Sequence, residues 1–404
     1  MLGASTNTKL FDADYSMKQL AINEGMERNF EPSQVGVFMG ESGKTVADPY
    51  FDGEGPDRTG CIHCGECMTG CRHNAKNTLD KNYLYLAQKI GAQILPEKEV
   101  YDIVLEENSN HTPTYRVYYK SSLGKRKKGS ELCRGVVFSG GVIGTVPLLL
   151  KLKKKRLPRL SNQIGCQLRT NNEALISVTS LDKKSKDYSK GLAIGSIFHI
   201  DSNTTVEPVR YGKGSGFTRL LAFPMNTSKH VVIRLIILLG QFFRQPVKIL
   251  KAVFTKKYAE RTSILLFMQT VEGTLRMKLG RFTQRRTVKE SGPAPKALLK
   301  EAFKVGKAYG EIVSGVPFAN FTDVLTGIPT TAHILGGAVI GSSVEEGVID
   351  DQNRVFGYKN LYVCDGSMIS ANPGVNPALS ITAISEYAMS KIPNKKVYST
   401  THLK

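Results

Sequence analysis

The sequence predicts an α/β fold into which an antiparallel sheet is inserted, and three stretches carry that prediction. A short apolar strand at 136–139 runs through closely spaced glycines into an apolar helix. Residues 173–281 contain several segments typical of strands in an antiparallel sheet. Residues 360–392 read as a strand, an Asp-Gly turn, a loop and a helix. With 404 residues, the chain can bury a large core.

Residues 1–50 mix a helical pattern with a short apolar stretch and do not resemble a complete domain. The next segment, GCIHCGECMTGC at 60–71, holds four of the seven cysteines: Cys61, Cys64, Cys67 and Cys71. Their C-x2-C-x2-C-x3-C spacing is that of a ferredoxin ligand run, although Arg72 stands where that run has proline and no second run exists. A cluster or metal, a structural loop of thiols, and labile disulfides all stay open.

The segment after the cysteine loop is predicted to form a helix and then strands. Thr78 can cap a helix within 75–92. Strand-like segments follow at 99–107 and 114–122. The apolar positions of the helix recur at helical spacing and are Leu79, Tyr83, Leu84 and Ala87.

The glycine turn at 140–144 is the first candidate cofactor site. It joins the strand at 136–139 to an apolar helix. Free backbone N–H groups and the positive end of a helix at such a turn can bind a phosphate or a flavin. Tight packing of the helix on the strand would also call for glycines, so both interpretations stay open. The turn contains Gly140, Gly141 and Gly144, and Thr145 follows it.

The inserted antiparallel sheet is expected between residues 173 and 281. After it, residues 285–325 are basic and then helical. The change from this pattern to the flanking strand-turn-helix units indicates an insertion into an α/β framework. The strand-like segments are 174–182, 192–201, 204–212, 263–271 and 274–282.

The last 80 residues carry the sharpest local signals. His333 stands just ahead of the paired glycines in HILGG. Asn376 is a natural N-cap, and Pro377 suits the first position of the helix that follows. The buried face of this helix is expected to contain Leu379, Ile384, Tyr387 and Ala388.

The net charge of +20, from 55 Lys and Arg against 35 Asp and Glu, favours contact with anionic partners. The basic clusters are scattered and no nucleic-acid motif accompanies them, so no nucleic-acid partner is expected. The apolar run at 231–254 is interrupted by Arg234 and Arg244 and is too short for a membrane span. An amphipathic helix on an anionic membrane surface and an ordinary core helix both stay open.

The odd number of cysteines and their crowding fit a reducing compartment better than a secreted disulfide framework. The first residues lack the charged and apolar regions of a signal peptide. We therefore expect a cytoplasmic protein, with peripheral membrane contact left open.

Taken together, these segments resemble the glucose-methanol-choline (GMC) family of flavin oxidoreductases, and within it the cholesterol-oxidase-like branch. The resemblance rests on HILGG, YVCDGSMISANPGVNPALSITA, KNTLDKNYLYLA and SGGVIGTVPLLL, and it covers essentially the whole chain. Gly141 replaces the usual alanine of the last motif, and Val146 interrupts its Thr-Pro pair. Relatives in this branch carry a similar cysteine loop.

One departure from the family is large. The family begins with a G-x-G-x-x-G unit that holds the pyrophosphate of FAD, and this sequence has none. Because Met1 continues directly into sequence that resembles a family interior, we expect that the N-terminal part is missing. The expected parts are a remnant of the N-terminal FAD and substrate region at 1–60, part of the FAD-binding domain with the cysteine loop at 61–170, a substrate-binding antiparallel sheet domain at 171–325, and a C-terminal FAD-binding and catalytic segment at 326–404.

The resemblance implies an FAD-binding, Rossmann-like GMC fold that oxidises the CH–OH group of a sterol or similar hydrophobic alcohol, a step in steroid and lipid metabolism. Hydride would pass to flavin N5 while a base near His333 takes the hydroxyl proton, with oxygen or an unknown carrier as electron acceptor. Asn376 would hydrogen-bond the substrate oxygen. Glu272 is the candidate for the carboxylate with which sterol oxidases move a double bond. The residues implied in FAD binding are Gly140, Gly141, Gly144, Thr145, Asp365, Gly366, Asn376 and Pro377.

Each of these assignments has a plainer alternative. His333 would otherwise be a structural histidine in a glycine turn, Asn376 a simple helix cap, and Glu272 a solvated side chain. For the whole chain, the alternatives are an inactive or cofactor-free fragment, or an electron-transfer protein that uses an iron–sulfur cluster at the cysteine loop.

Overall fold

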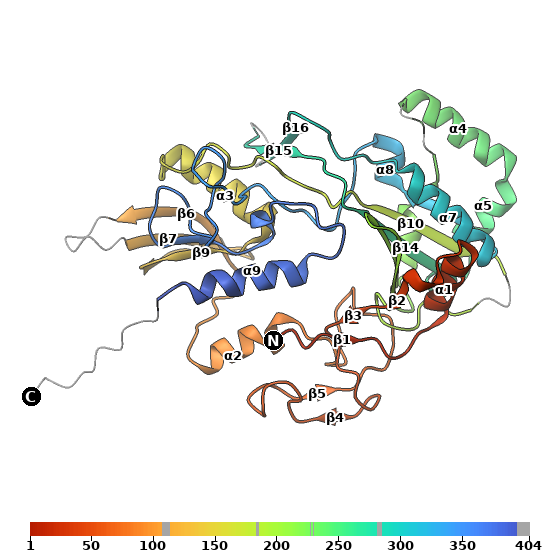
Figure 1. Ribbon diagram of the computed structural model, residues 1–404, viewed down its shortest axis with the longest axis horizontal. Coiled ribbons are helices and arrows are strands. Elements are labelled where there is room, and N and C mark those ends of the chain that lie inside the picture. The colour runs from red at the N-terminus through yellow and green to blue at the C-terminus, as the bar shows by residue number, and fades with distance from the viewer. Residues whose placement is uncertain (107–113, 183–185, 227, 229, 281–284, 394–404) are drawn as a thin grey trace, which may run out of the picture. The chain divides into compact units, whose positions relative to one another are not determined.

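The structure is a computed structural model that describes residues 1–106, 114–182, 186–226, 228, 230–280 and 285–393. The chain divides into two compact units, whose elements are labelled in Figure 1. Unit 1 contains 1–95, 172–271 and 296–331, and unit 2 contains 96–171, 272–295 and 332–404. The sheet-forming part of unit 1 therefore interrupts unit 2 in the sequence, which confirms the predicted insertion.

Unit 1 is built on a seven-stranded antiparallel sheet with the order β13-β17-β10-β14-β12-β11-β2. Four of these strands were predicted, and they are β10, β11, β12 and β14. The other three were not: β2 and β13 have three residues each, and β17 has six. The bounds are β2 (Phe30–Pro32), β10 (Ala174–Ser180), β11 (Ser196–Asp201), β12 (Thr204–Val209), β13 (Ala222–Pro224), β14 (Thr262–Gln269) and β17 (Gly315–Asn320).

Helices α1 (Asp12–Asn23) and α7 (Lys300–Ile312) contact each other and the sheet of unit 1 (Figure 1). Met17 and Tyr309, one from each helix, are fully buried in the same apolar cluster. Gly306 allows the close approach of α7, because a Cβ there would lie 2.6 Å from the side chain of Ile176. This packing covers part of the sheet with apolar side chains.

The helix predicted within 75–92 is shorter than expected. A 3-10 turn, Leu79–Lys81, precedes α2 (Tyr83–Lys89). Asn82 breaks the helical path with φ −135° and ψ −97°, and its side chain accepts the Tyr83 N–H. Thr78 makes no side-chain capping bond, so its predicted role was wrong. The remaining short elements before α2 are β1 (Ser5–Thr6), a 3-10 turn (Glu27–Asn29), β3 (Gln34–Val35), β4 (Thr45–Val46) and β5 (Arg58–Thr59).

The apolar run at 231–254 forms two successive helices of unit 1, α4 (Val231–Arg244) and α5 (Pro246–Val253). Most of their large apolar side chains are exposed, up to 83% for Phe243. Arg234 is buried and donates to the carbonyl of Leu325. Within the described parts of the chain, no helix is both long and apolar enough to cross a membrane. The remaining elements of unit 1 are a 3-10 turn (Gly216–Leu221), α6 (Tyr258–Arg261) and α8 (Phe321–Thr326).

Unit 2 contains a three-stranded antiparallel sheet and a parallel strand pair. The sheet joins β6 (Lys98–Glu106), β7 (Thr114–Ser121) and β8 (Lys128–Cys133), of which β8 was not predicted. The parallel pair is β9 (Val136–Phe138) and β18 (Leu361–Val363). A hairpin forms from β15 (Leu275–Lys278) and β16 (Arg286–Lys289), and residues 281–282 of the strand predicted at 274–282 lie outside the described residues.

Helix α3 (Gly141–Lys155) begins directly after β9 and packs its buried side chains, such as Val146 and Leu149, into the core of unit 2 with Leu361 and Val363. The strand-turn-helix predicted from the sequence is therefore present. These contacts fix the position of the turn between β9 and α3.

Helix α9 (Ala378–Ser390) starts one residue later than predicted. Pro377, with φ −86° and ψ 0°, occupies the capping position, so the predicted N-cap role of Asn376 was wrong. The buried face was also partly wrong: Leu379 is 69% exposed and Tyr387 is exposed as well. Ile384 contacts the core of unit 2 and Ala388 is buried, both as expected, and Ile381, which was not predicted, contacts the same core.

Candidate functional site

Two neighbouring parallel strands of unit 2, β9 and β18, end at the same edge. The glycine turn follows β9, and Asp365 stands two residues beyond β18. Thr145 Oγ1 donates to Asp365 Oδ2 at 2.5 Å and accepts the N–H of Gly140 at 3.2 Å. Ligands of open α/β sheets bind outside the carboxyl ends of the strands. The two sequence-predicted cofactor segments thus meet where such a ligand would bind.

Close packing does not explain the glycines of this turn. Among the residues that the structure describes, a Cβ added at Gly141 or at Gly144 would meet no atom within 4 Å. Gly141 also has a φ of +67°, which side chains disfavour. Because the backbone is open at both positions, a large group can approach it. Between the two interpretations of the turn, this geometry favours a cofactor.

The Asp-Gly turn after β18 is joined to the HILGG segment. Asp365 Oδ1 accepts the N–H and the hydroxyl of Ser367 at 2.8 and 2.5 Å. The N–H of Gly336 donates to the carbonyl of Gly366 at 3.0 Å. Only glycine fits at position 336, because its φ is +77° and a Cβ would lie 2.0 Å from the carbonyl oxygen of Gln167.

Residues 169–171 form hydrogen bonds with two segments, the one that contains His333 and the one that contains Asn376. The backbone of Arg169 exchanges hydrogen bonds of 2.7 and 3.1 Å with Leu335, two residues after His333. The amide of Asn171 donates to the carbonyl of Val375 at 3.0 Å, directly before Asn376. Both candidate side chains are half-buried. The structure thus attaches both segments to the same support.

Arg169 and Asn171 were missed by the sequence analysis. Both are buried, and Asn171 has no exposed surface. The signal that could have found them is the polar run RTNNE at 169–173, which stands directly before the strand predicted at 174–182. Five consecutive buried polar residues are unusual, because each needs hydrogen-bond partners.

Both carboxylate oxygens of Glu272 have partners in unit 2. Oε2 accepts from the Nε of Arg169 at 3.1 Å, and Oε1 accepts the N–H of Asn372 at 3.1 Å. The Arg169 side chain is 8% exposed, whereas that of Glu272 is 51% exposed. These contacts favour a role in positioning the loop before Asn376 over direct proton transfer.

The cysteine loop lies in unit 1, with the seven-stranded sheet, although the sequence analysis grouped it with 61–170. All four of its cysteines are free thiols and line one small cavity. Burial raises the pKa of Cys61 to about 11. Burial acts the same way on Cys71, but the N–H groups of Lys76, Ala75 and His73 outweigh it and lower the pKa of that thiol.

Comparison with known proteins agrees with this fold. Two family models, both described as GMC oxidoreductase, match residues 55–169 and 297–385. The chain is 40% identical over 418 residues to a cholesterol oxidase of Acinetobacter baumannii, covering 100% of this chain and 75% of that one. It is 40% identical over 411 residues to a cholesterol oxidase of Mycobacterium tuberculosis, covering 98% and 70%. The solved structure of a formate oxidase aligns with a TM-score of 0.50 at 13% identity, covering 77% and 62%.

These matches identify the chain as an FAD-dependent alcohol oxidoreductase. More narrowly, the chain belongs to the GMC oxidoreductase family.

Proposed function

We propose that this enzyme oxidises the CH–OH group of a sterol or a similarly hydrophobic alcohol. The observation that carries the proposal is the shared support of His333 and Asn376 by the stretch 169–171. The similarity to two proteins named cholesterol oxidases, over nearly the whole chain, supports the choice of a sterol.

FAD would be held at the edge where β9 and β18 end. The open backbone of Gly141 and Gly144 leaves room for it, and the N–H groups that start α3 favour an anionic group. Asp365 and Gly366 would line the same site. When bound there, FAD accepts the hydride that leaves the carbinol carbon.

His333 would accept the hydroxyl proton of the alcohol at one of its ring nitrogens. An imidazole is suited to this because its ordinary pKa lies near neutral pH. Asn376 would donate a hydrogen bond to the substrate oxygen. Because Pro377 takes the capping position, α9 does not require the Asn376 side chain as its cap. Asn376 would lie one residue before Pro377, and so close to the positive N-terminal end of α9.

The test is the His333→Gln variant of the full chain, with cholesterol and a straight-chain primary alcohol as substrates. We expect kcat to fall by about 10²-fold or more with FAD content unchanged, because general-base catalysis contributes about that factor. His199→Gln is the matched control, since His199 is a half-buried histidine on β11, in unit 1 and outside the segments that carry the candidate site. Parental turnover by His333→Gln would refute the role of His333, and oxidation of the straight-chain alcohol alone would refute the sterol.

We further propose that α4 and α5 rest on an anionic membrane surface, from which a lipid substrate could be drawn. Helices that lie in the interface combine exposed apolar side chains with basic ones. The exposed basic residues are Arg244, Lys248 and Lys251 in the two helices, and Lys256 and Lys257 just after α5. The exposed apolar residues are Val232, Ile233, Leu235, Ile236, Ile237, Leu239, Phe242, Phe243, Val247, Leu250 and Phe254.

Sedimentation with vesicles tests this contact. We expect binding to vesicles containing phosphatidylserine at low salt, with weaker binding to pure phosphatidylcholine. The double variant Leu239→Ser, Phe243→Ser should lose most of it. Leu123→Ser is the control, because Leu123 is a similarly exposed apolar residue, 64% exposed, in another part of the chain. Equal binding by both variants would contradict the assignment to α4 and α5.

A further inference from the structure

The four thiols of the cysteine loop converge on one cavity of unit 1. Its lining also includes the apolar residues Val37, Ile62 and Ala75. Cys61 is buried, and the other three are half-buried. None of the four is engaged in a disulfide. Four cysteine residues therefore line one cavity, beside apolar residues and the polar residues Glu66, His73 and Lys76.

The loop is held in this shape by its backbone. The N–H of Gly65 donates to the carbonyl of Gly191 at 3.0 Å, and the N–H of Gly191 donates to the carbonyl of His63 at 2.9 Å. Gly65 has a φ of +75°, and a Cβ there would lie 1.9 Å from the carbonyl oxygen of Ser189. A side chain at this position would push the loop off its support.

A backbone N–H group points at one of the four sulfurs. His63 donates to Cys61 Sγ at 3.4 Å. Hydrogen bonds of this kind tune iron–sulfur centres.

The spacing of the sulfurs distinguishes a cluster from a single zinc ion. Four sulfurs around one tetrahedral zinc, each at about 2.3 Å, would lie about 3.8 Å from one another. Across the described residues, the one set of at least three potential ligand atoms within 4.8 Å of one another is Cys64, Glu66 and His73. The four cysteines do not form such a set. A cluster carries each ligand on a different iron and so accepts the wider spacing.

Glu66 is also engaged elsewhere, because it pairs with the guanidinium of Arg72 at 3.3 Å. This contact competes with any metal at Cys64, Glu66 and His73. Arg72 stands where ferredoxin runs have proline. In this chain, that position therefore carries a guanidinium that neutralises the Glu66 carboxylate beside the loop.

We propose that Cys61, Cys64, Cys67 and Cys71 bind one [4Fe–4S] cluster. The spacing of the four cysteines in the sequence, their shared cavity and the backbone bonds that hold the loop carry the proposal. It does not depend on the substrate or on the role of His333, and it can be tested without turnover.

The experiment is anaerobic purification of the full chain with assays of iron, acid-labile sulfide and zinc. We expect about four iron and four sulfide per chain, a broad absorption near 400 nm, and an EPR signal after reduction with dithionite. Cys64→Ser and Cys67→Ser should lose most of the iron while FAD content stays unchanged. Cys166→Ser is the matched control, because Cys166 is a cysteine outside the loop, in unit 2.

Glu66→Gln separates the two metal sites. A cluster held by the four cysteines should keep its iron in this variant. About one zinc per chain that is lost in Glu66→Gln would overturn the proposal in favour of the site at Cys64, Glu66 and His73. A chain that stays free of iron after anaerobic reconstitution with iron and sulfide would also overturn it.

Discussion

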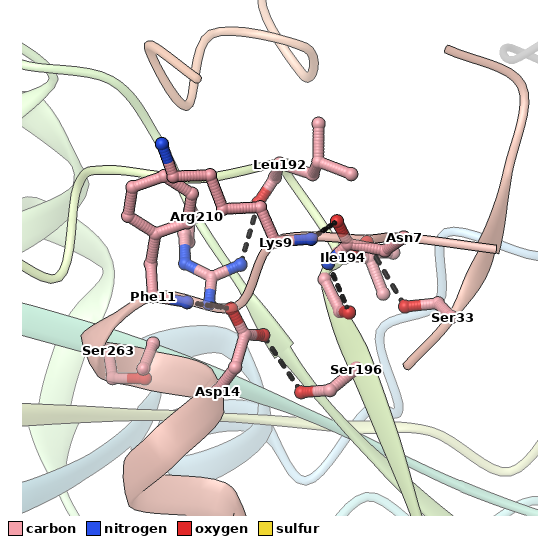
Figure 2. Close-up of polar contacts among 12 residues, drawn as sticks. Asn7, Lys9, Phe11, Asp14, Ser33, Leu192, Ile194, Ser196, Arg210 and Ser263 are labelled. Atoms are coloured by element: carbon pink, nitrogen blue, oxygen red, sulfur yellow. Dashed lines mark hydrogen bonds and ion pairs between the residues drawn. The ribbon is translucent and has the colours of Figure 1, made fainter. Parts of the chain in front are cut away.

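Arg210 and Asp14 form an ion pair of 2.5 Å in which neither side chain has any exposed surface. Figure 2 shows that the pair is also part of a wider network: Arg210 donates to the carbonyl of Leu192 at 2.7 Å, and Asp14 accepts from Ser196 and from the N–H of Phe11. Leu192 adjoins Gly191, which is bonded to the cysteine loop. The pair therefore braces the segment on which the loop rests.

Removing one member of this pair should be costly. Asp14→Asn leaves a guanidinium buried without its counter-charge, and we expect the free energy of unfolding to fall by about 3–5 kcal/mol. Urea denaturation of the full chain measures this. Glu27→Gln, which breaks the exposed pair of Glu27 with Lys18, should cost less than about 1 kcal/mol. If both variants lost the same free energy of unfolding, the buried pair would not contribute more to stability than the exposed one, which would contradict this prediction.

Thr145→Val tests the link between the two turns. Valine keeps the volume but removes the hydroxyl that donates to Asp365 and accepts from Gly140. We expect FAD affinity to fall by about 2 kcal/mol, or roughly thirtyfold, because a buried carboxylate loses a donor. Flavin absorbance per chain and a fluorescence titration measure it. Thr382→Val, which removes a hydroxyl that bonds the Ala378 carbonyl within α9, should bind FAD as the parent does.

Glu272→Gln separates positioning from proton transfer. If Glu272 holds the loop through Asn372 and Arg169, alcohol oxidation and any later shift of the double bond should fall together, by about tenfold or less. A carboxylate that moves the proton itself would abolish only the shift. Chromatography of the products with cholesterol measures the ratio. Accumulation of the unshifted ketone at a parental rate of oxidation would contradict the positioning role.

Asp323 should make the stability of the protein depend on pH. Its burial raises the pKa of the carboxyl from 3.8 to about 6, although Thr330 donates two hydrogen bonds to it. Because the folded state binds the proton more tightly than the unfolded state, this contribution is present below about pH 4 and is lost as the pH rises to about 6. The loss should amount to about 3 kcal/mol or less.

Urea denaturation at several pH values between 4 and 7.5 checks this. Asp323→Asn should flatten the slope, because its amide oxygen can still accept both bonds from Thr330 without taking up charge. Asp201→Asn, at an exposed position, should leave the slope unchanged. A slope that survives in Asp323→Asn would assign it to another group.

Two of the sheet strands that sequence reasoning found are rich in apolar side chains. The strands β10 and β14 are largely buried, and their apolar side chains are visible in the sequence. In contrast, β17 contains Gly315 and Pro317, which normally indicate a turn. It forms because its neighbour β10 offers a full antiparallel register, and that neighbour is more than 130 residues away in sequence.

The candidate site was predictable in part. The motifs around Asp365 and His333 are local and identified their segments. The contacts that assemble the site are not local: Thr145 meets Asp365 across 220 residues, and Asn171 meets Val375 across 204. No periodicity in one segment encodes such a pair. The sequence could therefore name the parts of the site without showing that Arg169 and Asn171 hold them.

The division of the chain also limits how the protein can be taken apart. The backbone passes from one unit to the other at 95/96, 171/172, 271/272, 295/296 and 331/332. Neither unit is a continuous stretch of sequence, so no terminal truncation yields one of them whole. A single proteolytic nick near any crossing leaves both units covalently connected through other crossings. The two units can therefore be exchanged or engineered only together, unlike domains that are joined by a single linker.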